Sequence, residues 1–495
     1  MRDDDLQTKR NQTRGGGGIK RLFSHSAIYS ISTSVQRLQG LVLTPIYTST
    51  VYIASMSDYS NYGLVYTFIA FMNFVYLYGM DSAFLRYFFL EEKEQKTVYS
   101  STFWVLSISG LTTSVLLFLF SSQIADWVLF SSELGRMIKY AGAILFFDTI
   151  GNFPFLLLRA EEKPVRFTLF RLLRFTLELL LNILFVVVLK HGVWGILQAN
   201  VIASVINLLF MLPFTLKYLQ LKVDFSLTRQ MVKFGLPFLP NGIAFMVIEM
   251  MDRFLVTKYL GKEVMAFYHA NCKFASVLFL LIIGFRNAWQ PFFLKEAKSG
   301  NPRKTYPRIL SFYLAGAGML VVLITFFVRD VLTYPILNGG YLLGRDYWDG
   351  ITIIPWRVLA YFFYGIYVIF TPAFYILKKS QYMVLFTGLG AIVNLLINLF
   401  LLPHWGLWAA VTANAAAYGT MMLAIFLASQ KIYPLPINWL RTGLQVLLVG
   451  CAMFLYYITG LSFGVKVIAF LVVGGAMYLI TLGKFSRIGE GHVSK

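Results

Sequence analysis

Charged residues are scarce in this sequence. Asp, Glu, Lys and Arg make up 13% of its 495 residues, whereas soluble proteins carry roughly 25%. A chain so poor in charge cannot cover a large soluble domain with a hydrated surface. The scarcity therefore excludes an ordinary water-soluble globular protein.

Cysteine is also rare, with only Cys272 and Cys451 in the chain. Both lie inside apolar runs, and their spacing fits neither a disulfide framework nor a metal site. We find no nucleotide-binding loop and no nucleophile–base pair, so we expect no cofactor and no enzymatic activity. A cleavable signal peptide is lacking too, because residues 1–21 are polar, basic and Gly-rich; we interpret them as a disordered cytoplasmic tail.

Long apolar runs dominate the rest of the chain. Hydrophobic residues make up 58% of it, and a transmembrane α-helix needs about 20 mainly apolar residues. Fourteen runs are long enough: 24–47, 61–81, 99–120, 138–158, 167–189, 193–215, 232–256, 264–289, 308–328, 351–377, 381–402, 405–428, 440–459 and 464–483. The sequence therefore predicts an all-α, polytopic membrane protein with about 14 transmembrane helices.

Basic residues predict which side each loop faces, because Lys and Arg concentrate in cytoplasmic segments. If the chain begins in the cytoplasm, 28 of its 43 Lys and Arg residues fall in cytoplasmic segments, 8 in external loops and seven within spans. We therefore expect a multi-pass protein of the cell inner membrane with both termini cytoplasmic. The net charge of +20 reflects this topology, with anionic membrane lipids as incidental partners, rather than nucleic-acid binding.

The chain also repeats itself. Residues 58–89 align without a gap on 263–294, and GVWGILQAN (192–200) matches GLWAAVTAN (406–414). Each copy holds six predicted helices, and because six is even, both copies enter the membrane from the same side. The repeat predicts two six-helix lobes in parallel, related by an axis along the membrane normal. The expected domains are the tail 1–21, an N-lobe at 22–218, a C-lobe at 219–430, and two further helices with a cytoplasmic tail at 431–495.

This two-lobed pattern resembles a known transporter superfamily. Residues 252–273 read DRFLVTKYLGKEVMAFYHANCK, and YSNYGLVYTF (59–68) follows an Asp in the first lobe. These segments resemble the polysaccharide-biosynthesis branch of the multidrug/oligosaccharidyl-lipid/polysaccharide exporter superfamily, to which O-antigen and exopolysaccharide repeat-unit flippases belong. The positions that match the branch are Asp252, Gly261, Tyr268, Ala270 and Lys273.

The resemblance covers nearly the whole chain and implies a function. It implies a flippase that moves undecaprenyl-pyrophosphate-linked oligosaccharide repeat units across the inner membrane by alternating access, in lipopolysaccharide or exopolysaccharide biosynthesis. The implied partners are the lipid-linked oligosaccharide and a proton or sodium ion as a candidate coupling ion. Lipid II flippases are expected to carry several arginines in their cavity helices, whereas the span 61–81 has none, so lipid II is the less favoured cargo.

Two alternatives stay open. An ion-coupled multidrug antiporter of the same superfamily would need an acidic, apolar cavity for its cationic cargo. A membrane-bound polysaccharide polymerase or ligase would need a large external loop with catalytic residues, and the longest external loop, 329–350, has no convincing catalytic pair. The charges within spans favour anionic cargo, because seven are basic (Arg37, Arg171, Arg174, Arg253, Lys273, Arg286, Arg357) and four are acidic (Asp148, Glu178, Glu249, Asp252).

Arg37 is the first candidate for binding cargo. It lies in the middle of the most polar span, 24–47, and a charge at that depth costs about 2.5–3.5 kcal/mol to insert. A guanidinium offers a pyrophosphate both positive charge and a fork of donors. The alternative interpretation is a structural ion pair with an acid of another helix.

The spans 232–256 and 264–289 hold a second group of candidates, joined by a short external turn. Helical spacing puts Glu249 with Arg253, and His269 with Lys273, on common faces, with Asp252 beside them. We expect Arg253, His269 and Lys273 to bind cargo, and Glu249 and Asp252 to bind a coupling ion. A static ion-pair network between neighbouring helices explains the same pattern equally well.

Further candidates lie in the first lobe. Arg171, Arg174 and Glu178 share one face of the span 167–189, and Asp148 lies in the middle of 138–158. The arginines are candidates for binding cargo and the two acids for ion coupling, although Asp148 could instead neutralise one of the arginines. Arg286 and Arg357 lie near span ends, where we expect their side chains to snorkel to the interface.

The segment GLPFLPNG (235–242) predicts a hinge. Gly235, Pro237, Pro240 and Gly242 fall within eight residues, and proline removes backbone hydrogen bonds from a helix. We expect the helix to be bent or broken here, and to move during alternating access.

Overall fold

The computed structural model describes residues 39–90, 94–161, 163–299, 302–335, 340–377, 379 and 381–482. The predicted tail 1–21 and most of the first predicted span, Arg37 included, lie outside these residues. The N-terminal half holds α2 (Thr44–Tyr47), α3 (Met56–Leu77), α4 (Met80–Leu90), α5 (Gln95–Leu119), α6 (Ser121–Leu129), η1 (Ser132–Leu134), α7 (Gly135–Ala160), α8 (Pro164–Asn182), the π-helical η2 (Ile183–Val188) and α9 (Gly192–Tyr218).

The C-terminal half is helical as well. Its elements are α10 (Phe225–Gly235), α11 (Phe238–Leu260), α12 (Lys262–Ser299), α13 (Pro302–Leu332), the 3₁₀-helical η4 (Arg345–Ile353), α14 (Ile354–Phe370), α15 (Pro372–Ile376), α16 (Tyr382–Trp405), α17 (Leu407–Ile432), α18 (Trp439–Thr459) and α19 (Phe463–Leu482). Within the described residues no strand is assigned, and one isolated bridge joins Pro335 to Tyr341. The all-α prediction is confirmed.

Twelve helical stretches in the described residues are long and apolar enough to cross a membrane. They coincide with twelve of the fourteen predicted spans. The remaining two are 24–47, which lies largely outside the described residues, and 167–189, which α8 and η2 form. The charges of α8 at Arg171, Arg174 and Glu178 lower its hydropathy. The chain is therefore a multi-pass membrane protein.

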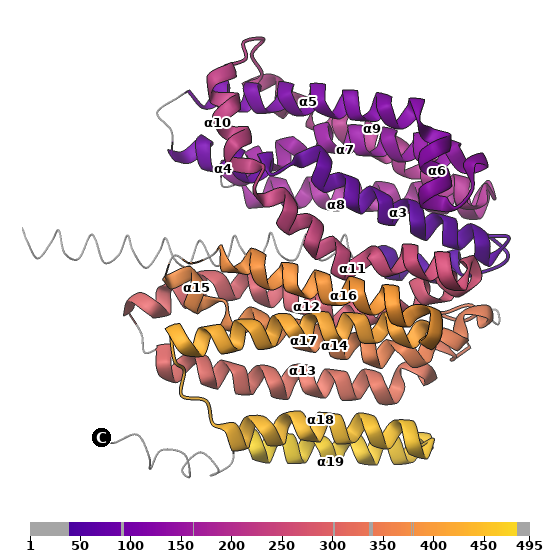
Figure 1. Ribbon diagram of the computed structural model, residues 1–495. Coiled ribbons are helices and arrows are strands. Elements are labelled where there is room, and N and C mark those ends of the chain that lie inside the picture. Colours follow the sequence, from indigo (N-terminus) through magenta and orange to yellow (C-terminus); the bar gives the residue numbers. More distant parts are fainter. Residues whose placement is uncertain are drawn as a thin grey trace, which may run out of the picture.

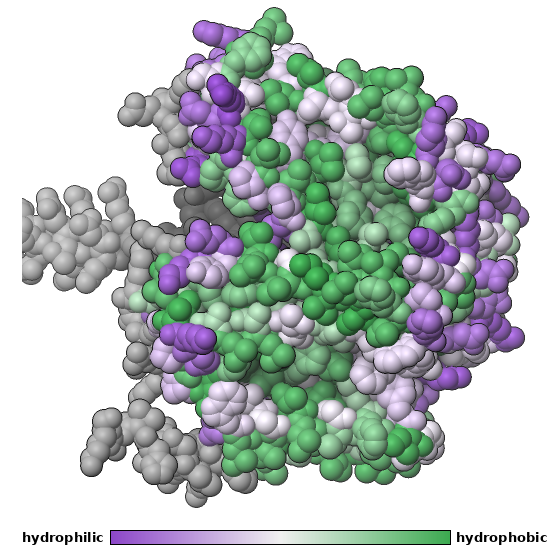
Figure 2. Space-filling view, in the orientation of Figure 1, coloured by the Kyte–Doolittle hydropathy of each residue, from purple (hydrophilic) through white to green (hydrophobic). Residues whose placement is uncertain are grey.

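The helices form two bundles (Figure 1). The helices α3 to α9 gather in one and α12 to α17 in the other, with α18 and α19 packed along α13 at the far edge. Helix α11 runs between the bundles and contacts α3, α12, α16 and α17. Figure 2 shows apolar side chains across the middle of the molecule and polar ones at its two ends, as a membrane-spanning protein requires.

The bundles meet through helices that the sequence repeat pairs with each other. Helix α3 contacts α12, and Ser60 Oγ donates a hydrogen bond to Met265 Sδ at 3.3 Å across a sequence separation of 205 residues. That separation is also the offset of the repeat, so equivalent residues touch each other. Residues do so only near an axis that relates the two copies. The contact therefore agrees with a repeat whose axis passes between α3 and α12.

The predicted departure from regular helix geometry is confirmed. Helix α10 ends at Gly235 and α11 begins at Phe238, and Leu236 and Pro237 form a turn between them. Gly235 lies against Gly79, which follows α3: a Cβ added to Gly235 would lie 2.9 Å from the Gly79 carbonyl. Gly242 faces the ring of Phe74 in the same way, and an added Cβ would clash with that ring. The two glycines thus let the broken helix pack directly against α3.

Capping residues fix where the helices near the bundle contact begin. Ser55 caps α3 by accepting a hydrogen bond from the Asp58 amide, and Asp224 caps α10 by accepting one from the Leu227 amide. Such caps satisfy amides that the first turn leaves without partners. The Ser55 cap thus fixes the start of α3, the helix that carries Tyr59 and Tyr62.

Candidate functional site

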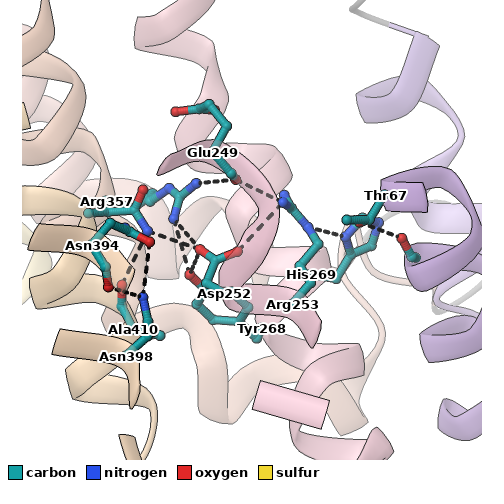
Figure 3. A network of polar contacts seen from close by, with 12 residues as sticks. Thr67, Glu249, Asp252, Arg253, Tyr268, His269, Arg357, Asn394, Asn398 and Ala410 are labelled. Carbon is teal, nitrogen blue, oxygen red and sulfur yellow. Dashed lines mark hydrogen bonds and ion pairs between the residues drawn. The ribbon is translucent and has the colours of Figure 1, made fainter. Parts of the chain in front are cut away.

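Asp252 is fully buried in α11, where three donors converge on one of its oxygens (Figure 3). Its Oδ2 accepts hydrogen bonds from Tyr268 Oη at 2.6 Å, Arg357 Nη1 at 2.8 Å and Asn414 Nδ2 at 2.9 Å. A buried carboxylate is tolerated when it is both paired and hydrogen-bonded. The three donors come from α12, α14 and α17, so Asp252 ties these helices to α11.

Arg357 corrects an expectation drawn from the sequence. It does not snorkel to an interface: it is 1% exposed and lies against Asp252. Its Nη2 also donates to the Glu249 backbone oxygen at 3.0 Å. The error came from placing Arg357 by its distance from the end of a span, whereas α14 is covered by neighbouring helices over most of its length.

Glu249 lies one turn before Asp252 on α11 and is held differently. Its carboxylate accepts hydrogen bonds from Tyr361 Oη at 3.2 Å and from Tyr418 Oη. Among the described residues no basic side chain forms an ion pair with it. Glu249 is thus a buried carboxylate whose side-chain partners are neutral hydroxyls.

Arg253 and His269 lie on the other side of Asp252, toward α3 (Figure 3), and Arg253 Nη1 is 3.7 Å from Asp252 Oδ1. Arg253 Nε donates to His269 Nδ1 at 3.1 Å, and Arg253 Nη1 donates to the Glu249 backbone oxygen at 2.8 Å. His269 packs beside the rings of Tyr59 and Tyr62, with centroids 5.6 and 5.9 Å away. The predicted cluster therefore divides into an acidic half inside the C-terminal bundle and a basic half at the contact between the bundles.

Lys273 lies on the same face of α12, one turn beyond His269. Its Nζ is 5.5, 5.3 and 4.9 Å from the ring centroids of Tyr47, Tyr59 and Tyr62. We call these three residues the tyrosine cage. Within the part of the chain that the structure describes, Lys273 Nζ is buried and has no hydrogen-bond partner. Within the described residues, these aromatic faces are the groups that offset its positive charge.

The first-lobe candidates also come together. Arg174 donates to Asp148 Oδ1 at 2.7 Å and to Asn152 Oδ1 at 2.7 Å. The guanidinium of Arg171 lies 4.0 Å from the ring centroid of Phe155. Asp148 therefore neutralises an arginine of α8, the alternative that the sequence left open.

Glu178, the fourth acidic candidate, lies on α8 one turn beyond Arg174. Its backbone oxygen accepts a hydrogen bond from Asn182 Nδ2 at 2.8 Å, and Asn182 Oδ1 accepts one from Tyr47 Oη at 2.6 Å. This short chain of contacts connects α8 to the tyrosine cage.

Several residues of the site were missed in the sequence. The tyrosines of the cage, and Tyr268, Tyr361, Tyr418 and Asn414 around the acids, were not singled out as contacts. Four of them carried a signal: Tyr268 matches the family pattern, Asn414 is paired with Asn200 by the repeat, and Tyr59 and Tyr62 lie in the segment 59–68 that resembles the family. The others are tyrosines among 29 in the chain, and nothing in their spacing separates them from packing residues.

Comparison with known families confirms the resemblance expected from the sequence. Residues 52–292 match the family described as polysaccharide biosynthesis protein. No curated protein matches the sequence. The family match spans the bundle contact, including α3 and most of α12.

The fold matches solved structures of a flippase and of transporters. The lipid II flippase MurJ in an inward closed conformation matches with a TM-score of 0.71 and 17% identity, covering 93% of this chain and 99% of that one. An inward-facing multidrug resistance MATE family transporter of the MOP superfamily matches with a TM-score of 0.59 and 15% identity, covering 86% of this chain and 95% of that one. A MOP superfamily transporter from Pyrococcus furiosus matches with a TM-score of 0.59 and 16% identity, covering 83% of this chain and 94% of that one. Its binding pocket is described as having reverse polarity. The chain thus has the MOP superfamily fold.

Proposed function

We propose that the protein is a flippase that carries undecaprenyl-pyrophosphate-linked oligosaccharide repeat units across the inner membrane by alternating access. The family match and the fold support a transporter of polysaccharide biosynthesis. A lipid-linked cargo keeps its polyprenyl tail in the bilayer while its sugars cross, so the break between α10 and α11 is our candidate for the moving hinge.

The observation that carries the proposal is the imbalance of charge where the bundles meet. Arg357 and Arg174 are each paired with an acid, Asp252 and Asp148. Lys273 has no acidic partner among the described residues. Arg253 Nη1 lies 3.7 Å from Asp252 Oδ1, so Arg253 and Arg357 share this one carboxylate. Arg253 and Lys273 therefore bring more positive than negative charge to the contact with α3, which suits a pyrophosphate and not a cationic drug.

Arg37 completes this proposal, although it lies outside the described residues. We expect Arg37→Ala to abolish export while the protein still inserts and folds. Arg37→Lys should rescue only in part, because an ammonium replaces the guanidinium fork. Normal export by Arg37→Ala would remove Arg37 from the site, and the arginines of α8 would take its place as candidates.

The experiment that tests the function is gene replacement in strains that lack their own repeat-unit flippase. Export of lipid-linked glycan to the outer leaflet should return with the wild-type gene, and fall at least tenfold with Lys273→Gln or Arg253→Gln, as loss of a charged contact to phosphate predicts (~1.5–3 kcal/mol). Lys258→Gln is the matched control, since Lys258 is exposed on α11. Equal export by all variants would contradict the proposal.

A further inference from the structure

The tyrosine cage joins the two bundles at one end of the molecule. Tyr47 and Tyr59 lie beside the connection 48–55, and Lys273 reaches them from α12, which begins at Lys262. The distribution of Lys and Arg predicts that 48–55 and the turn at Gly261 are external. We call this end the predicted outer end. A helical side chain leans toward the N-terminus of its helix, so Lys273 points toward this end.

The cage is built from both sides. Tyr47, Tyr59 and Tyr62 come from the N-terminal bundle and are 2%, 0% and 8% exposed. Asn182 fixes Tyr47 by accepting its hydroxyl hydrogen bond at 2.6 Å, and the ring of Tyr62 packs on Tyr66 at 4.7 Å. The cation that fills the cage comes from the other bundle. Separation of the bundles must therefore pull Lys273 away from the rings.

A second layer of contacts covers the cage. The amide of Gly344, just before η4, donates to Thr48 Oγ1 at 3.1 Å, and the ring of Tyr347 meets Tyr59 edge-on at 5.4 Å. Asn271 of α12 donates to the Tyr347 backbone oxygen at 2.9 Å. The segment at Gly344–Tyr347 thus closes over the same contact and also connects the two bundles.

The closed contact is incompletely satisfied. Within the described residues, three buried polar atoms have no hydrogen-bond partner at this place: Tyr59 Oη, His269 Nε2 and Lys273 Nζ. Buried donors without acceptors oppose the folded contact, whereas a cation over desolvated rings favours it. Because these two contributions to the stability of the contact oppose each other, the bundles can separate when another acceptor binds the unpaired donors.

We propose that Lys273 in the tyrosine cage is the latch that holds the two bundles together at the predicted outer end, and that the pyrophosphate of the cargo releases it. The first half concerns this chain alone. The second half rests on the proposed function, because it needs an anionic cargo to withdraw the ammonium from the rings. Tyr59 and Tyr62 are positioning residues in this account.

A cysteine pair can report on the latch. Ser60 Oγ and Met265 Sδ lie 3.3 Å apart across the bundle contact, so the thiols of Ser60→Cys with Met265→Cys should be joined by a short bifunctional thiol reagent when this end is closed. The native Cys272 and Cys451 are first replaced by alanine. The full chain is reconstituted in liposomes without cargo, and the cross-linked fraction is measured after brief exposure to this reagent.

Variants then separate the latch from simple packing. Lys273→Met should reduce the rate of cross-linking about tenfold, as loss of a desolvated cation–π contact predicts, and Lys273→Arg should retain it. Tyr62→Leu should open the contact from the other bundle, whereas Tyr62→Phe keeps a ring and should not. Lys258→Met is the control, because Lys258 lies over Tyr259 at 5.5 Å on the exposed surface. Wild-type cross-linking in both Lys273→Met and Tyr62→Leu would overturn the latch.

Lipid addition tests the release. Undecaprenyl pyrophosphate in the liposomes should lower cross-linking of the otherwise unchanged pair, and neutral undecaprenol should not. Unchanged cross-linking with the pyrophosphate lipid would overturn release by cargo. The latch itself is decided without lipid, so it can stand if the proposed function fails. Conversely, the gene can restore export in cells while Lys273→Met and Tyr62→Leu leave cross-linking unchanged. That result would overturn the latch and leave the proposed function standing.

Discussion

Asp252 and Arg357 show, residue by residue, how this membrane protein accommodates charge. Removing one partner of a buried pair leaves the other unpaired and costs about 3–5 kcal/mol. We therefore expect Asp252→Asn or Arg357→Gln to lower stability by an amount of this order, measured by thermal unfolding in detergent. The double variant should be more stable than the sum of the two losses predicts.

Arg286→Gln is the control, since Arg286 is exposed and donates only to Tyr364 among described residues. An equal loss of stability in this variant would refute the special role of the pair.

Glu249 is predicted to behave differently from Asp252, because its carboxylate is held by the hydroxyls of Tyr361 and Tyr418. A glutamine can accept from the same hydroxyls, so Glu249→Gln should fold normally. We propose that Glu249 binds the coupling ion, and we expect this variant to bind cargo but to lose turnover and its dependence on the proton or sodium gradient. Unchanged gradient dependence in transport assays would exclude Glu249 as the coupling group.

The same residues show how much of the site could be predicted from the sequence alone. The cost of an intramembrane charge pointed correctly to Asp148, Arg174, Glu249, Asp252 and Lys273 as residues that need partners. Their partners could not be predicted, because Asp252 binds Arg357 and Asn414 from helices 105 and 162 residues away. Pairing across such separations depends on the packing of helices, which local spacing does not encode.

At the scale of single helices, the break between α10 and α11 was predictable and its packing was not. Two prolines and two glycines within eight residues predict a break in the helix. The reason for glycine at 235, close approach to Gly79 after α3, involves a contact 156 residues away. The predicted span 167–189, which α8 and η2 form, stays a prediction, because it is not among the twelve stretches that are long and apolar enough to cross a membrane.

Gly235→Ala tests this packing. The new Cβ would lie 2.9 Å from backbone atoms of Gly79, and backbone cannot move as a side-chain tip can. We expect a loss of about 1–3 kcal/mol in stability, as for overpacking, together with slower transport. Gly284→Ala in α12 is the control, because nothing lies within 4 Å of its added Cβ and alanine favours helix by about 1 kcal/mol. Equal melting temperatures for both variants would contradict the close approach.

Across the whole molecule, the sequence predicted the arrangement well. Apolar length depends on the bilayer and not on tertiary contacts, so the helical class and twelve of the fourteen predicted spans followed from composition. The repeat offset of 205 reappears as the contact between Ser60 and Met265. The domain boundaries and the cytoplasmic location of both termini stay predictions.

Cysteine labelling tests the orientation. In a chain lacking Cys272 and Cys451, Tyr334→Cys in the predicted external loop should react with a membrane-impermeant maleimide on intact cells. Leu221→Cys in a predicted cytoplasmic loop should react only after lysis. Both native side chains are exposed, at 68% and 91%. Labelling of Leu221→Cys from outside would reverse the topology, and the tyrosine cage would then lie at the cytoplasmic end.

The central claim, that surplus positive charge between the bundles selects a pyrophosphate-linked cargo, is tested most directly by flipping in proteoliposomes. The purified protein is supplied with a short oligosaccharide on undecaprenyl pyrophosphate, the same glycan on a neutral lipid, and a cationic drug. We predict that only the pyrophosphate lipid crosses, and that Lys273→Gln with Arg253→Gln removes this transport while Lys258→Gln does not. Transport of the neutral glycolipid at the same rate, or of the cationic drug instead, would contradict the account.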